Sequence, residues 1–120
     1  MSKQLRSALV GAIVLCGPSL ALAEGATVGD PADKPAIPFP GHSVHRLLDG
    51  SETERDIAFS ELTVAPQTMG APPHRHSKED EFFYVLEGEV NFLDGEETIT
   101  ATEGQVVALK RGHLHGFWNG

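Results

Sequence analysis

The residues best suited to chemistry lie in the run Gly-Ala-Pro-Pro-His-Arg-His-Ser-Lys-Glu-Asp-Glu at positions 70–81. His74 and His76 are two residues apart, so on an extended strand both imidazoles point to the same side. Neutral imidazole is a common ligand for first-row transition metals. Glu81 adds an anionic oxygen if the intervening chain returns it to the same cavity. The pair of histidines alone leaves a second interpretation open, in which both are solvated polar residues of a loop.

On an extended strand, alternate residues after Glu81 point to the same side as its carboxylate and so define its surroundings. Phe83 and Val85 share the inward face of Glu81, and the other face takes Phe82, Tyr84 and Leu86. An acid at the head of an apolar inward row is costly to bury unless something compensates its charge. A metal ion would supply that compensation.

A second stretch carries Gly104, Lys110, Gly112, His115 and Asn119. Together the two stretches resemble the cupin superfamily. The first motif of that family is Gly, a short gap, His-x-His, three or four residues, Glu, six residues and Gly. The second motif is Gly, five residues, Pro-x-Gly, two residues, His, three residues and Asn.

The match to both motifs spans about residues 57–119, and residues 89–103 between them have the short length of small bacterial members. The matching positions are His74, His76, Glu81 and Gly88 in the first motif and Gly104, Gly112, His115 and Asn119 in the second. Two positions depart from the pattern. Three rather than five residues separate Gly70 from His74, and Lys110 replaces the usual Pro.

The resemblance implies a small all-β double-stranded β-helix, a jelly-roll-like barrel. Its metal ligands would be His74, His76, Glu81 and His115, around one divalent transition metal ion. Fe, Mn, Ni, Co, Cu and Zn are not distinguished, because His and Glu suit several of them. The quercetin dioxygenase-like members imply a metal-dependent dioxygenase acting on a small phenolic or enolisable substrate, with Glu81 as ligand or catalytic base. The alternative is a non-catalytic small-molecule or metal-binding module; an isomerase or epimerase ranks last.

The rest of the pattern predicts short strands separated by glycine-containing turns, which is typical of a β-sandwich or barrel. We expect strands at 57–64, 81–86, 89–93, 97–101, 106–109 and 114–118. In the family, further strands follow the second-motif histidine, whereas this sequence ends one residue after Asn119. We therefore expect a barrel that is incomplete at its C-terminal end, as a fragment or with a partner chain over the open edge. We also expect the first-motif ligands to be better positioned than His115.

The first 23 residues have the features of a secretory signal peptide with a signal helix. Lys3 and Arg6 precede an apolar run at 8–15, and Ala-Leu-Ala at 21–23 provides a cleavage site. A membrane anchor would need roughly 20 apolar residues. A lipoprotein cleaved before Cys16 is disfavoured by the bulky Leu15. The sequence thus predicts a periplasmic or secreted protein.

The mature chain at 24–120 has no cysteine, so any metal must bind to nitrogen and oxygen. It carries seven Lys and Arg against 17 Asp and Glu, a formal net charge of −10. This charge disfavours nucleic acid and anionic membrane surfaces as partners. The small-molecule ligand is what the resemblance to the cupins implies. Residues 24–41, rich in Gly and Pro, are predicted to be a flexible arm before a cupin domain at 42–120.

Several other residues allow two interpretations. His113 could be a spare ligand or, more simply, an exposed polar residue. Phe82 and Tyr84 could form the face of a homodimer or pack beneath the N-terminal strand. We expect Arg75 to point away from the metal into solvent, His42 and His45 to lie at the surface, and Phe117 and Trp118 to belong to the core.

Overall fold

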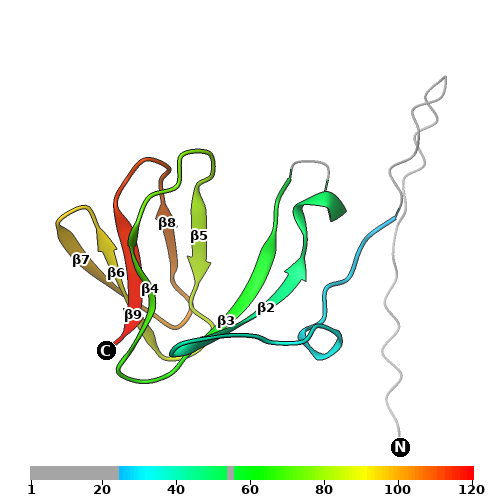
Figure 1. Cartoon of the computed structure of the whole chain (residues 1–120), viewed down its shortest axis with the longest axis horizontal. Coiled ribbons are helices and arrows are strands. Elements are labelled where there is room, and N and C mark those ends of the chain that lie inside the picture. Colours follow the sequence, from blue (N-terminus) through cyan, green and yellow to red (C-terminus); the bar gives the residue numbers. More distant parts are fainter. Residues whose placement is uncertain (1–24, 54–55) are drawn as a thin grey trace, which may run out of the picture.

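The computed structural model describes residues 25–53 and 56–120, so the predicted signal peptide at 1–23 lies outside the described residues. These residues form β-strands and two short 3-10 turns (Figure 1). In chain order they are η1 (Pro31–Asp33), β1 (Ile37–Phe39), β2 (His42–Leu48), η2 (Gly50–Glu52), β3 (Phe59–Val64), β4 (Thr68–His74), β5 (Glu81–Tyr84), β6 (Glu89–Asp94), β7 (Glu97–Thr102), β8 (Val106–Leu109) and β9 (His115–Asn119). The predicted all-β class is confirmed. Within 25–53 and 56–120, no helix is both long and apolar enough to cross a bilayer.

Two antiparallel sheets enclose the core. One has the strand order β4-β9-β6-β7, and the other pairs β5 with β8. The buried apolar side chains come from both sheets and are Val85, Phe92, Ala101, Leu109 and Phe117. The ring of Phe83 lies 5.3 Å from that of Phe92 and 5.0 Å from that of Phe117, measured between centroids. This aromatic cluster joins the two sheets, because Phe83 belongs to β5 while Phe92 and Phe117 belong to β6 and β9.

The predicted inward and outward rows of β5 are confirmed. Val85 is buried and Phe83 packs against the core. The outward row consists of Phe82, Tyr84 and Leu86, which are 71%, 62% and 66% exposed. Alternation along an extended chain, read from the sequence, was therefore sufficient to place Glu81 on the core side of the sheet.

The ends of the strands depart only slightly from the prediction. β8 spans the predicted residues 106–109, and the other predicted strands differ by one or two residues at an end. Glycines with positive φ mark the turns, including Gly88 at 74° and Gly104 at 80°. An L-residue with a side chain rarely adopts this conformation, which is why the turns could be located from the sequence.

The segment preceding the main body was predicted less well. The expectation that residues 24–41 carry no regular structure is wrong at Ile37–Phe39, because β1 pairs with β2 through Ile37–Val44 and Phe39–His42. Pro38 is compatible with a strand here because β1 pairs on one side only. β1, β2 and β3 form a third sheet, and in Figure 1 the β2–β3 hairpin points away from the two facing sheets.

β4 lies at an edge of the four-stranded sheet, a position in which its two prolines are tolerated. It pairs with β9 only, and the pairing is irregular around Ala71, just before Pro72. Gly70 is buried in this strand, and a Cβ at this position would overlap the ring of Phe117. The space for this core aromatic ring therefore accounts for Gly70, whose spacing departs from the family motif.

Candidate metal centre

The four residues predicted as ligands come from separate elements and meet at one end of the facing sheets. His74 ends β4, His76 follows in the loop, Glu81 begins β5 and His115 begins β9. One ligand atom from each lies within 4.8 Å of every other. His74 and His115 are register partners across β4 and β9, so sheet pairing brings the two motifs together.

The converging atoms are three imidazole nitrogens and one carboxylate oxygen. His74 Nε2 lies 3.0 Å from His76 Nε2. Glu81 Oε2 lies 3.4 Å from His76 Nε2 and 3.0 Å from His115 Nε2. Such a set of nitrogen and oxygen donors suits a divalent first-row transition metal ion.

Two of these atoms are buried without a hydrogen-bond partner among the described residues. They are Glu81 Oε2 and His115 Nε2, whose 3.0 Å approach does not have hydrogen-bond geometry. Buried polar atoms in folded proteins are normally satisfied, so unpaired atoms that face one another need an explanation. A cation between them would satisfy both, and the donor set therefore fits a metal ion.

The contacts of the Nδ1 atoms of His74 and His76 also favour metal binding through Nε2. His74 Nδ1 lies 2.7 Å from the carbonyl oxygen of Pro72, which can only accept, so Nδ1 carries the proton and Nε2 offers its lone pair. His76 Nδ1 lies 2.7 Å from Glu79 Oε1. Partners of this kind orient metal-ligating histidines and fix their tautomer. Glu79 was not identified from the sequence, where it is one of three consecutive acids.

His115, which was expected to be less well positioned than the other ligands, is the most buried of the four. His115 is 1% exposed, whereas the side chains of His76 and Glu81 are 26% and 31% exposed. The reason is the place of β9, which pairs with β4 on one side and β6 on the other. The strand that carries His115 is thus held from both sides by strands that precede it in the sequence.

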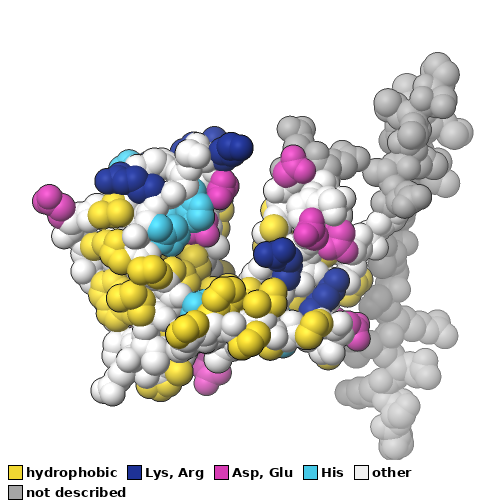
Figure 2. Space-filling model, in the orientation of Figure 1, with side chains coloured by type: hydrophobic (Ala, Val, Ile, Leu, Met, Phe, Trp, Pro, Cys, Tyr) yellow, Lys and Arg dark blue, Asp and Glu magenta, His cyan; other side chains and the backbone are white. Residues whose placement is uncertain are grey.

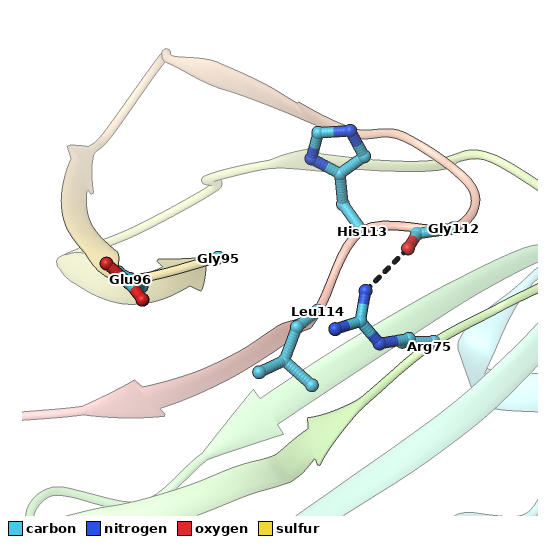
Figure 3. A pocket seen from close by; sticks show the side chains of 6 residues that line it. All are labelled: Arg75, Gly95, Glu96, Gly112, His113 and Leu114. Carbon is cyan, nitrogen blue, oxygen red and sulfur yellow. Dashed lines mark hydrogen bonds between the residues drawn. The ribbon is translucent and has the colours of Figure 1, made fainter.

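Hydrogen bonds join the first-motif loop to the turn before His115. The Gly112 N–H donates to the His76 carbonyl at 2.7 Å, and Arg75 Nη1 donates to the Gly112 carbonyl at 2.7 Å. Figure 3 shows the second of these bonds, with His113 and Leu114 beside it. Arg75 therefore points away from the ligands as predicted, but it has a structural partner as well as solvent exposure.

Asp80 and Arg111 add a third connection between the same two segments. Asp80 accepts from the backbone N–H of Arg111 at 2.9 Å and from its guanidinium at 3.1 and 3.3 Å. The bonds from the Arg111 side chain and backbone lower the pKa of the Asp80 carboxyl. Neither residue was singled out from the sequence, because 31 positions separate them.

Replacing Arg111 by Met is expected to raise the pKa of Asp80 back toward its ordinary value of 3.8. The pKa of Asp80 is lower in the folded than in the unfolded protein, so its contact with Arg111 stabilises the fold at pH values above the unfolded-state pKa of about 3.9. This stabilisation is lost as the pH falls through the pKa of Asp80 in the folded state. Titration of the Asp80 carboxyl carbon by NMR measures the shift. Asp49, whose pKa is lowered chiefly by Ser51, is the control and should not change. An unchanged Asp80 pKa in the variant would contradict this assignment.

The other histidines lie outside the ligand group. His113 is 61% exposed at its side chain and sits 3.6 Å from Asp94, in line with the simpler interpretation. It lines a shallow pocket with Arg75, Gly95, Glu96, Gly112 and Leu114 (Figure 3). His45 contacts the Lys34 carbonyl through Nδ1, and His42 stacks on Phe39; both are half-buried. As expected, Phe117 belongs to the core, while Trp118 is half-buried.

Comparison with known families agrees with the fold. The family model described as "Cupin domain" matches residues 60–120, which include all four candidate ligands and both motifs. The chain therefore belongs to the cupin family. A search of curated proteins finds no match to it.

Proposed function

We propose that this cupin binds one divalent transition metal ion through His74, His76, Glu81 and His115. The observation that carries the proposal is the convergence of four ligand atoms, two of them buried and otherwise unpartnered. The polar contacts of His74 and His76 on their Nδ1 sides leave both Nε2 atoms facing the common centre. Fe, Mn, Ni, Co, Cu and Zn all remain compatible with this donor set.

We further propose that the metal serves a dioxygenase reaction on a small phenolic or enolisable substrate. A metal ion in such a site supplies a Lewis acid that polarises a bound oxygen. Glu81 is the partly exposed acid of the group, so it is the side chain that would accept the proton of a phenol or enol. His115 is buried and would act only as a fixed ligand.

A non-catalytic binding module is the second candidate, and one observation favours it. Solvent reaches the candidate site, because the side chains of His76 and Glu81 are 26% and 31% exposed. A site that solvent reaches in this way does not exclude water from a reaction. Such a site could still bind a ligand reversibly.

Oxygen consumption separates the two candidates. Protein loaded with each metal in turn is mixed with a panel of flavonols and 1,3-diketones in an oxygen-electrode cell. We expect uptake coupled to substrate loss, and a decrease of about 100-fold or more in Glu81→Gln, as for removal of a general base. His113→Gln is the matched control and should keep full activity. Substrate binding by calorimetry without uptake for any metal would contradict the dioxygenase and support the binding module.

We also propose that the protein is exported and that the mature chain starts at Glu24. The charged start, short apolar run and Ala-Leu-Ala at 21–23 support this, as does the location of all 17 acids after that site. Intact mass of protein from a periplasmic or culture fraction tests it. Uncleaved chain confined to the cytoplasm would contradict it.

A further inference from the structure

We propose that Asp80 and Arg111 are positioning residues for the metal ion, because they hold the loop that carries one ligand and leads into another. This role presupposes the proposed metal site and concerns the affinity of that site. His76 is the candidate ligand that no strand contains: it lies in the loop at 75–80, which ends directly before Glu81 at the start of β5. The position of His76 therefore depends on the contacts of this loop.

The loop at 75–80 and the turn at 110–114 both cross from one sheet to the other. The loop joins β4 of the four-stranded sheet to β5, and the turn joins β8, the partner of β5, to β9 of the four-stranded sheet. Figure 1 shows both connections at the same end of the two sheets, and Figure 2 shows Lys and Arg side chains at this end beside histidine side chains. Because His74 and His115 belong to one sheet and Glu81 to the other, the two connections help to set the distances across the site.

Asp80 and Arg111 connect the loop to the turn. Asp80 Oδ1 accepts hydrogen bonds from the backbone N–H of Arg111 at 2.9 Å and from its Nε at 3.1 Å, and Asp80 Oδ2 accepts from Nη2 at 3.3 Å. An isolated surface ion pair contributes little, but a bidentate arginine–carboxylate pair has a defined geometry. Asp80 directly precedes the ligand Glu81, so the pair fixes the chain where it enters β5.

Two further hydrogen bonds extend this connection to His76. The Gly112 N–H donates to the His76 carbonyl at 2.7 Å, and Arg75 Nη1 donates to the Gly112 carbonyl at 2.7 Å, the bond drawn in Figure 3. Gly112 directly follows Arg111, so the residue that holds Asp80 also places the donor that holds His76. Both halves of the loop are therefore bound to the same turn.

A loop that is fixed before the ion binds raises the affinity, because the ion then does not have to order its ligands. Loss of a residue that supports a ligand costs about 10- to 100-fold in metal affinity. The side chains of Arg111 and Asp80 are 58% and 37% exposed, so solvent weakens their contact. We therefore expect an effect at the lower end of this range, about tenfold.

Co²⁺ is the probe that tests this role. Its affinity for the parent and for Arg111→Met is measured by competition with a chromogenic chelator, and its visible absorption bands report the arrangement of the ligands. We expect about tenfold weaker binding and altered bands in Arg111→Met. In the metal-free variant, the Gly112 amide that bonds to His76 should exchange with solvent about tenfold faster than in the parent.

Lys110→Met is the matched control, because it removes the same charge from the neighbouring exposed position. It should bind Co²⁺ within about threefold of the parent and with the same bands, as is usual for a surface substitution. Arg111→Lys keeps the charge but not the bidentate geometry, so it should recover only part of the affinity.

A double-mutant cycle tests whether the two side chains act as a pair. If they do, Asp80→Asn combined with Arg111→Met should bind Co²⁺ about as weakly as Arg111→Met alone. A purely structural role would lower the urea midpoint of the metal-free variant and leave the Co²⁺ affinity and bands of the folded protein unchanged, which would overturn the proposal. Additive losses in the cycle would also overturn it. A parent that binds no Co²⁺ would contradict the metal site itself, and this role with it.

Discussion

Replacing His74 and His76 together by alanine is expected to abolish metal binding. The parent should retain about one equivalent of metal after desalting, and the double variant less than about a tenth of that, because only Glu81 and His115 remain as ligands. Loss of a residue that merely supports a ligand already costs about 10- to 100-fold in affinity, and loss of two ligands costs more. Elemental analysis of the purified proteins measures the difference.

The matched control removes two histidines that lie outside the ligand group. His45 contacts the Lys34 carbonyl and His113 is exposed near Asp94. The double variant His45→Ala and His113→Ala should therefore keep its full metal content. Equal metal in the parent and in the variant that lacks His74 and His76 would show that the ion binds elsewhere.

Replacing Phe92 by alanine is expected to cost about 3–5 kcal/mol of unfolding free energy. Phe92 is fully buried, and its ring lies 5.3 Å from that of Phe83 and 6.2 Å from that of Phe117. Removing it leaves a cavity between the two sheets that the strands cannot close without losing their pairing. Because domains of this size have an unfolding free energy of only about 5–15 kcal/mol, the variant should lose a large part of its stability. Denaturant titration followed by Trp118 fluorescence gives the value.

Phe82→Ala makes the same chemical change on the outer face of β5. Phe82 is 71% exposed, so the change should shift the unfolding free energy by no more than about 0.5 kcal/mol. Similar losses in the two variants would mean that the core does not lie between the sheets as described.

Local signals in the sequence predicted β3 and β5 to β9, but not β1, β2 or β4. Glycines such as Gly88 and Gly104 mark turns because they adopt positive φ, and the strands follow between them. His74 and His76 are two apart on an extended chain and were therefore expected to share a face, whereas Glu81 was expected to join them only if the intervening chain returned it to the same cavity. His115 could be added only through its resemblance to the second motif, because no local rule links residues 34 positions apart.

Features that depend on distant contacts could not be predicted in this way. The Asp80–Arg111 pair and the bond from Arg75 to Gly112 arise where two loops meet, and each residue alone appears to be an ordinary surface charge. β1 was missed because its composition, with Pro38 at its centre, is typical of a loop; pairing with β2 overrides that preference. The burial of His115 depends on β9 lying between β4 and β6, which is a property of the topology.

The pairing of His74 with His115 has a consequence for how the sheet forms. These residues are opposite each other in the register of β4 and β9. Shifting β9 by one residue relative to β4 would turn every side chain of β9 to the other face of the sheet. His115 would then point away from the other three candidate ligands. A metal ion can then bind with all four ligands only when the strands are correctly aligned, and its binding free energy favours that alignment over every slipped one. The ion would thus stabilise the correct register of β9 relative to β4.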